Sequence, residues 1–209
     1  LGVEVYIVEL KDRILSLVLD EKGSMLAEKA VREAGANILT SHTVREIVGK
    51  EDNKNIVGGA ILDDGKKIPC DIVLIAIGVI PRIELAINSG IKINRGILVD
   101  RSMSTSVPNV YACGDVVEAY DFVYLRNQIA ALWPNAYLGG RVAGFNMAGV
   151  NAQYPWGTTM NSLTYFGLSI TSAGIVNPEQ QDGFEILAFD DPDREIYRRI
   201  VLREEVIVG

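Results

Sequence analysis

The chain has 209 residues, of which 48% are hydrophobic, and its 20 basic and 27 acidic side chains give a net charge of −7. This composition supplies a hydrophobic core for one large domain or two modest ones. The negative charge repels phosphate backbones and argues against nucleic acid as a partner. The longest apolar run, residues 72–80, is far shorter than the ~20 residues that a membrane-spanning helix needs.

The first segment, residues 1–9, is predicted to be a strand that ends on Glu9. In a Rossmann unit, a carboxylate at the end of the second strand binds the ribose hydroxyls of NAD and repels the extra phosphate of NADP. A surface charge at a strand end explains Glu9 equally well, because no G-x-G-x-x-G motif precedes it. The residues alone leave both interpretations open.

A helix and a β-rich stretch are predicted next. The helical pattern starts at Ser24, and Gly35 is placed to end it. Residues 37–48 and 56–61 favour strands, and Asp63-Asp64-Gly65 favours a hairpin turn into residues 66–69.

Residues 71–81, Asp-Ile-Val-Leu-Ile-Ala-Ile-Gly-Val-Ile-Pro, form an apolar run that predicts a strand buried on both faces. Gly78 permits close approach of the backbone, and Pro81 stiffens the turn that follows. A short helix over residues 84–89 and a β pair around Ile93 and residues 97–99 are expected next.

Residues 105–115 read Thr-Ser-Val-Pro-Asn-Val-Tyr-Ala-Cys-Gly-Asp, a short strand at 110–112 that runs into a glycine turn. Gly114 lets the backbone turn tightly beside a ligand, and Asp115 offers two acceptor oxygens. A polyol would suit that carboxylate. A plain helix cap or turn former is the alternative for Asp115.

Two further regions complete the chain. Residues 134–147 predict a helix with Pro134 in its first turn, and the N–H groups and dipole at its start favour an anion. Residues 148–209 predict a β-rich unit with strands over residues 161–165, 169–176, 184–189 and 196–202.

The motif at 105–115 resembles the second flavin-binding motif, T-x-x-x-x-V-Y-A-x-G-D, of the FAD-dependent pyridine nucleotide-disulfide oxidoreductases. Residues 71–81 are similar to the A-x-G-x-x-P crossover of that family, although Arg82 stands where the family usually has Asn. Residues 161–174 resemble the C-terminal interface domain of its branch of NADH oxidases, rubredoxin reductases and nitrite reductase flavoproteins.

The resemblance implies an α/β fold with partial Rossmann-like NAD and FAD domains and a small α+β interface domain. The implied boundaries are a partial NAD-binding domain over residues 1–78, a second FAD-binding segment over 79–147 and an interface domain over 148–209. Because the chain starts at Leu1 without methionine and carries no glycine-rich dinucleotide fingerprint, we expect a fragment that lacks the N-terminal FAD-binding and first NAD-binding segments.

The resemblance also implies cofactor-binding roles. Asp115 would bind the ribityl chain of FAD, and Glu9 would bind the adenosine ribose of NAD. The remaining cofactor-binding candidates are Gly78, Pro81, Gly114, Pro134, Asn135 and Ala136, of which the last three would contact the isoalloxazine.

The function implied for the intact protein is hydride transfer from NADH to FAD, followed by electron delivery to oxygen, a disulfide, rubredoxin or a nitrite-reducing partner. This chemistry requires no acid or base from the protein, so no catalytic residue is named. Two alternatives stay open: a non-catalytic flavin- or nucleotide-binding module, and an inactive fragment that self-associates through residues 148–209. A homodimer through the same residues is a further expectation.

Cys70 and Cys113, the only cysteines, show no C-x-x-C spacing, which suits a reducing compartment and predicts a cytoplasmic location. His42, the only histidine, has no second ligand near it in the sequence. We therefore expect His42 at the surface or at a strand edge, and no metal site.

Overall fold

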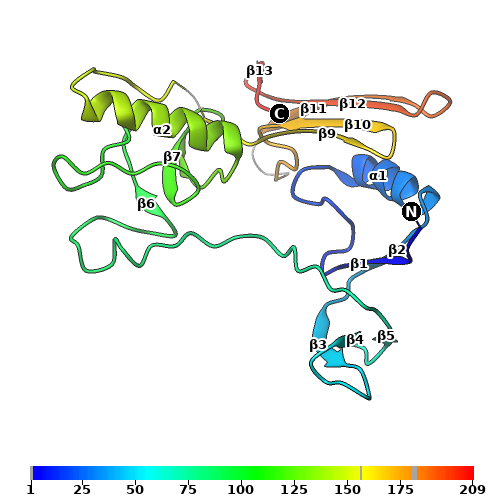
Figure 1. The fold of residues 1–209 in the computed structure, drawn as a ribbon. Coiled ribbons are helices and arrows are strands. Elements are labelled where there is room, and N and C mark those ends of the chain that lie inside the picture. Colours follow the sequence, from blue (N-terminus) through cyan, green and yellow to red (C-terminus); the bar gives the residue numbers. More distant parts are fainter. Residues whose placement is uncertain (1, 156, 180–182) are drawn as a thin grey trace. The chain divides into compact units, whose positions relative to one another are not determined.

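The computed structural model describes residues 2–155, 157–179 and 183–209, so the first residue of the predicted strand 1–9 lies outside the described part (Figure 1). The chain divides into two compact units. Residues 1–77, 161–172 and 176–207 form unit 1, and residues 78–160, 173–175 and 208–209 form unit 2. No helix in the described residues is long and apolar enough to cross a membrane.

Unit 1 contains a parallel strand pair, β1 and β2, joined through helix α1, and two antiparallel sheets. Its elements are β1 (Val5–Glu9), α1 (Glu21–Glu33), β2 (Ala36–Thr40), β3 (Val44–Gly49), β4 (Val57–Leu62), β5 (Lys67–Ile68), β11 (Phe184–Asp191), β12 (Ile196–Arg203) and β13 (Val206–Ile207). The antiparallel sheets have the orders β3-β4-β5 and β11-β12-β13. The predicted strand 1–9 is confirmed over Val5–Glu9, and the predicted stretch 37–48 forms two strands, β2 and β3, divided at residues 41–43. The predicted strand 56–61 and the hairpin turn at Asp63–Gly65 are confirmed, and Gly65 has the positive φ of 88° that favours glycine there.

The core of unit 1 lies between α1 and the strands beside it. Ala27 and Val31 of α1 are fully buried and pack with Ile38 of β2. Ile170 of the β9–β10 hairpin belongs to the same cluster. The β9–β10 hairpin and helix α1 therefore share one hydrophobic core.

Helix α1 starts three residues before the predicted Ser24. Asp20 is its N-cap and accepts a hydrogen bond from the Gly23 amide at 2.9 Å. Ser24 is buried inside the helix, where its hydroxyl donates to the Ile14 carbonyl at 2.8 Å. Gly35, with a φ of 90°, follows the helix end as predicted.

Asp20 also connects α1 to the β11–β12 hairpin. Its second carboxylate oxygen accepts hydrogen bonds from the Tyr197 hydroxyl at 2.5 Å and from the Arg199 guanidinium at 2.9 Å. Burial, and then the hydrogen bond to Asp20, raise the pKa of Tyr197 to about 12. One carboxylate therefore caps a helix and holds two side chains of β12.

Unit 2 is built around a three-stranded sheet and helix α2. Its strands are β6 (Ile97–Leu98), β7 (Val117–Asp121) and β8 (Arg126–Gln128), with β6 parallel and β8 antiparallel to β7, and its helix is α2 (Trp133–Met147). Val142 of α2 packs with Val117 of β7 and with Val99, Met103 and Tyr154. The predicted helix at 134–147 is confirmed with one added residue.

The two strands β9 (Met160–Tyr165) and β10 (Leu168–Ala173) form a hairpin whose end residues Met160 and Ala173 fall in unit 2 and whose other residues fall in unit 1. The predicted strand 161–165 is confirmed, and the predicted strand 169–176 forms over Leu168–Ala173. Phe166, with a φ of 48°, and Gly167, with a φ of 87°, make the turn.

The prediction of a buried strand at 71–81 is wrong for this structure. The segment has no strand partner among the described residues and runs as an extended chain (Figure 1). Most of its side chains are exposed, with Leu74 88% exposed and Ile77 92% exposed, and only Val73 and Pro81 are half-buried. A strand exists only where a neighbour takes its backbone hydrogen bonds, and β1 and β2 pair with each other alone.

The predicted short helix at 84–89 is also wrong, because these residues form a series of turns. The Ile87 amide donates to the Ile83 carbonyl at 3.0 Å, but the pattern does not continue. Asn88 and Gly90 adopt positive φ angles of 66° and 78°, which a right-handed helix cannot accommodate.

We expect Asp20→Ala to lower the free energy of unfolding by about 2–4 kcal/mol, since it removes a helix cap and leaves the hydroxyl and guanidinium of β12 without their acceptor. Urea unfolding followed by far-ultraviolet circular dichroism measures the change. Asp12→Ala is the control, because that carboxylate is 75% exposed and its loss should change stability by less than about 0.5 kcal/mol. Equal effects of the two variants would contradict the role of Asp20.

Candidate functional site

The turn at Gly114 and Asp115 lies in unit 2 at the start of β7. Before it, the predicted strand 110–112 is reduced to a single bridge between Tyr111 and Ser104, supported by a 3.1 Å bond from the Ala112 amide to the Met103 carbonyl. Gly114 has a φ of 85°, a conformation that strains any residue with a Cβ. The chain therefore turns at the position that the sequence predicts.

Asp115 presents an unused carboxylate at this turn. It is exposed, and within the described residues no hydrogen bond or ion pair engages it. The two acidic residues that follow are instead buried and bonded. Glu118 accepts from the Gly96 amide at 2.8 Å, and Asp121 accepts from the Gln128 side chain at 2.7 Å. Of these three carboxylates, only that of Asp115 is available to a ligand.

Two glycines of helix α2, Gly139 and Gly140, face the turn at Gly114. A Cβ placed on Gly139 would lie 3.4 Å from the Met103 sulfur, 3.6 Å from the Cys113 Cβ and 4.0 Å from the Gly114 nitrogen. A Cβ on Gly140 would lie 3.8 Å from the Cys113 sulfur. The small-residue face of the helix thus rests on the two residues that precede Asp115, which fixes the turn relative to α2.

The start of α2 carries no side-chain cap. Leu132 is the N-cap and makes no capping hydrogen bond, and no acidic residue lies in the first turn. Pro134, which is exposed, supplies no N–H, and the amide of Ala136 already donates to the Leu132 carbonyl at 3.0 Å. The amides of Trp133 and Asn135 are first-turn groups without intrahelical acceptors, so they can donate to a ligand.

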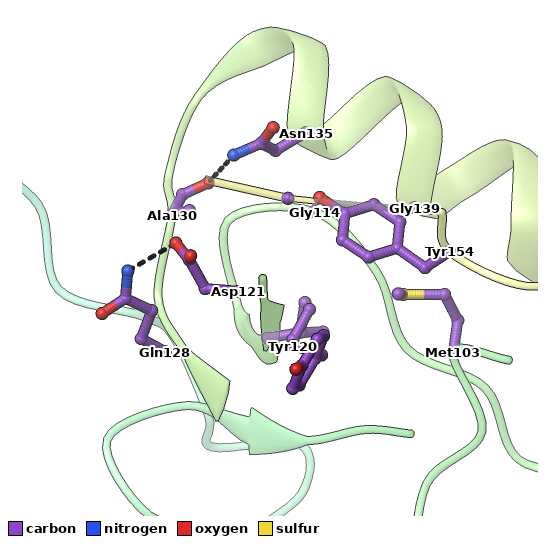
Figure 2. A pocket seen from close by; sticks show the side chains of 12 residues that line it. Met103, Gly114, Tyr120, Asp121, Gln128, Ala130, Asn135, Gly139 and Tyr154 are labelled. Carbon is purple, nitrogen blue, oxygen red and sulfur yellow. Dashed lines mark hydrogen bonds between the residues drawn. The ribbon is translucent and has the colours of Figure 1, made fainter. Parts of the chain in front are cut away.

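The Asn135 side chain has a structural partner. Its amide nitrogen donates to the Thr158 carbonyl at 3.1 Å and lies 3.5 Å from the Ala130 carbonyl (Figure 2). This side chain fastens the segment before β9 to the start of α2. The contribution that Asn135 can make to a cofactor therefore comes from its backbone amide.

A small polar cavity of ≈ 20 Å³ lies beside the turn and the helix (Figure 2). It brings together the predicted Gly114 and Asn135 with Asp121, Gln128 and Tyr154. Burial, and then the charge of Asp121, raise the pKa of Tyr154 above its ordinary value. The volume accommodates a water molecule and is far too small for a cofactor, so the exposed surface at Asp115 is the better candidate for ligand binding.

Sequence reasoning missed the cavity residues. Asp121, Gln128 and Tyr154 belong to no motif in the sequence, and the fold brings Tyr154 to the cavity from the segment that follows α2. A run of acidic residues after a glycine turn gives no sign of which carboxylate is buried.

The other predicted site residues lie on separate segments. Glu9 ends β1, and its carboxylate accepts from the Lys11 amide at 2.8 Å. Gly78 has a φ of 97° in the exposed run, with nothing within 4 Å of the position of a Cβ. Pro81 follows it and is half-buried. Glu9 belongs to unit 1, whereas Gly78, Pro81 and the Asp115 turn belong to unit 2.

Residues 1–140 match the family model for pyridine nucleotide-disulphide oxidoreductases, and residues 160–209 match that for the C-terminal domain of rubredoxin NAD+ reductase. The chain belongs to the pyridine nucleotide-disulphide oxidoreductase family. The resemblance based on the flavin motif is thereby confirmed, as is the expected α/β fold class of this family.

Two curated relatives illustrate the relationship. The NADH oxidase of Methanocaldococcus jannaschii is 37% identical over 154 residues, which cover 73% of this chain and 33% of that protein. The NAD(P)H nitrite reductase of Bacillus subtilis is 32% identical over 210 residues, which cover 100% of this chain and 25% of that protein.

Solved structures agree on the fold. An NAD-dependent persulfide reductase from A. fulgidus superposes with a TM-score of 0.86 at 30% identity, covering 99% of this chain and 40% of that one. A ferredoxin reductase from Rhodopseudomonas palustris gives a TM-score of 0.82 at 24% identity, covering 99% and 49%, and supports the fold alone. The chain of this family member thus spans between a quarter and about half of the length of these relatives.

A graded pair of substitutions tests the contact between α2 and the turn. We expect Gly139→Leu to lower the free energy of unfolding by about 1–3 kcal/mol, because its side chain would push the helix away from Cys113 and Gly114. Gly139→Ala should be neutral or stabilising by up to about 1 kcal/mol, since a single Cβ fits at contact distance and alanine favours helix. Chemical unfolding of both variants measures the difference, and equal stability would contradict the contact.

Proposed function

We propose that the whole protein is an FAD-dependent oxidoreductase that takes a hydride from NADH and delivers electrons to an acceptor. The unused carboxylate of Asp115, on a glycine turn held against α2, is the observation that carries this proposal. Relatives named NADH oxidase, rubredoxin-NAD(+) reductase and FAD-dependent pyridine nucleotide-disulphide oxidoreductase support it. When bound, FAD supplies the chemistry of hydride acceptance and electron transfer, and the protein binds and orients the cofactor.

The residues around the turn fit a flavin nucleotide. Asp115 would accept hydrogen bonds from the hydroxyls of the ribityl chain, because an ionised carboxylate is an acceptor without protons of its own. The uncapped first turn of α2 would donate its amides to the electron-rich edge of the isoalloxazine, with Pro134, Asn135 and Ala136 along that edge. No residue of this set has to move a proton.

Glu9 is our candidate for recognition of NADH. Its carboxylate lies at the carboxyl end of a parallel strand, the edge at which nucleotides bind in α/β sheets. It would accept hydrogen bonds from the ribose hydroxyls and disfavour a ribose phosphate, which predicts a preference for NADH over NADPH. Gly78 and Pro81 would shape the crossover between the two cofactor regions.

The electron acceptor is proposed as a class: oxygen, a disulfide, rubredoxin or a nitrite-reducing partner. The names of the relatives include an NADH oxidase, an NAD(P)H sulfur oxidoreductase, a rubredoxin reductase and a nitrite reductase. The rate of NADH oxidation, measured with each acceptor in turn, identifies which of these four classes the protein uses. Whole protein that carries no flavin and does not oxidise NADH with ferricyanide as acceptor would overturn the proposed function.

Self-association through residues 148–209 is proposed as a property of the same protein. Leu187, Phe189 and Ile200 are 50%, 56% and 40% exposed, and Leu187 pairs with Ile200 across β11 and β12. Apolar side chains gathered on one sheet face favour a partner surface. Sedimentation that finds a monomer at tens of micromolar would contradict the dimer.

We also propose a cytoplasmic location, because Cys70 and Cys113 are both free thiols. Cell fractionation tests this, and recovery of the protein with secreted markers would contradict it.

We expect Asp115→Ala to weaken FAD binding by the whole protein about ten- to a hundredfold. A hydrogen bond to a charged group contributes about 1.5–3 kcal/mol, and 1.4 kcal/mol is a factor of ten in affinity. Fluorescence titration of the apoprotein with FAD measures the constant. Asp193→Ala, an exposed aspartate in the β11–β12 turn, removes the same charge and should leave affinity unchanged. Unchanged affinity in the Asp115 variant would contradict the assignment.

A further inference from the structure

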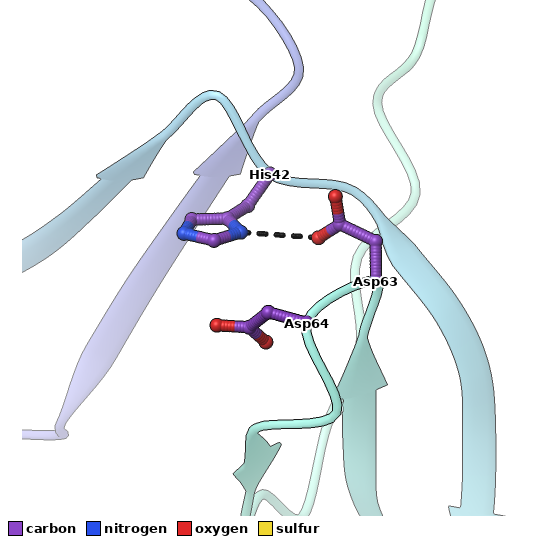
Figure 3. Close-up of side chains that lie close together, drawn as sticks. All are labelled: His42, Asp63 and Asp64. Atoms are coloured by element: carbon purple, nitrogen blue, oxygen red, sulfur yellow. Dashed lines mark hydrogen bonds and ion pairs between the residues drawn. The ribbon is translucent and has the colours of Figure 1, made fainter.

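Three potential metal ligands converge in unit 1, whereas the flavin candidates belong to unit 2. His42 follows β2, whereas Asp63 and Asp64 stand in the turn between β4 and β5 (Figure 3). One nitrogen of the imidazole and one oxygen of each carboxylate all lie within 4.8 Å of one another. The group combines imidazole with carboxylates, the donor set that first-row divalent metal ions accept.

Backbone hydrogen bonds hold the two segments in place. The His42 amide donates to the Glu9 carbonyl at 3.1 Å, and the Asp63 amide donates to the Thr43 carbonyl at 3.0 Å. The Asp64 carboxylate accepts from the Lys66 amide at 2.8 Å through one oxygen. The three donors are therefore presented by ordered backbone, so an ion would not have to order a mobile loop.

The separation of the donors suits one ion. His42 Nδ1 and Asp63 Oδ1 are 3.0 Å apart. Two donors each about 2.1 Å from an ion subtend about 90° at that separation, which is the angle of octahedral coordination and narrower than the tetrahedral angle. Figure 3 shows the carboxylate of Asp64 beside the same imidazole ring. A rotation of this exposed side chain would bring its oxygen to a third coordination position, and water would complete the shell.

The charge balance also favours a cation. Among the ion pairs of the described residues, Asp63 takes part only in the one with His42, and Asp64 in none. Two carboxylates meet a single imidazole in this cluster, so a bound cation would supply positive charge that the cluster lacks.

We propose that His42, Asp63 and Asp64 form a surface site for an octahedral first-row divalent metal ion. In the bound state the imidazole is neutral with its proton on Nε2, and Nδ1 gives its lone pair to the ion in place of the hydrogen bond to Asp63. The ion joins the end of β2 to the β4–β5 turn. The proposal is independent of flavin binding, and it replaces the expectation of no metal at His42.

Equilibrium dialysis against Ni²⁺ tests the site in the 209-residue chain, with any affinity tag removed. We expect one Ni²⁺ per chain, and at least about tenfold weaker binding in both His42→Asn and Asp64→Asn. Asp52→Asn is the matched control, because Asp52 is exposed in the β3–β4 connection and its loss changes the net charge by the same amount. It should bind Ni²⁺ as the wild type does.

Three results would overturn the proposal. The first is the absence of saturable binding by the folded wild-type chain, and the second is equal weakening by the Asp52 and Asp64 substitutions, which would reveal a general charge effect. The third is loss of binding after alkylation of the cysteines. Circular dichroism of each metal-free variant checks folding, and Asp64→Asn decides the outcome if His42→Asn does not fold.

His42 supplies a second readout, since it is the only histidine of the sequence. Electron spin-echo spectroscopy of the Cu²⁺-loaded chain should show coupling to the remote nitrogen of one imidazole, and this signal should be lost in His42→Asn. A Cu²⁺ complex without imidazole coupling would contradict ligation by His42.

Discussion

The close approach of α2 to the turn at Cys113 and Gly114 is the constraint on which the proposed flavin site depends. A side chain longer than that of alanine at Gly139 would separate the helix from the turn, and the carboxylate of Asp115 would lose its fixed place relative to the helix start. The site is therefore made by packing as much as by ligand-binding atoms. The nearby carboxylates of Glu118 and Asp121 are not available to bind a cofactor, because both are buried and accept hydrogen bonds from the protein.

Asp20 plays the corresponding part in unit 1. A helix cap is a local interaction, but here the same carboxylate reaches side chains of β12 more than 170 positions later in the chain. The first helix also packs against the β9–β10 hairpin, since Val31 and Ile170 belong to one hydrophobic cluster. The segment that matches the rubredoxin reductase C-terminal domain is thus bonded to the segment that matches the pyridine nucleotide domain, and the two stabilise each other.

The sequence predicted the features that local chemistry determines. The turn at Gly114, the helix with Pro134 in its first turn and the hairpins of the C-terminal half follow from neighbouring residues. Features that depend on residues far away in the sequence were not predicted. Ser24 was predicted as the helix start, but it lies inside α1 and its hydroxyl donates to the Ile14 carbonyl. The convergence of His42 with two aspartates could not be read from positions 21 residues apart. The run 71–81 has a strand's composition, yet a strand requires a neighbour that composition does not supply.

The exposed run 72–80 has a consequence for the behaviour of this chain in solution. It is extended, contains no charged residue and has no strand partner among the described residues. Uncharged segments of high β propensity with open backbone groups are templates for intermolecular sheets. A preparation of these 209 residues is thus exposed to ordered aggregation that begins at one short segment while both units keep their cores. A lysine placed inside the run would act as a gatekeeper against such pairing.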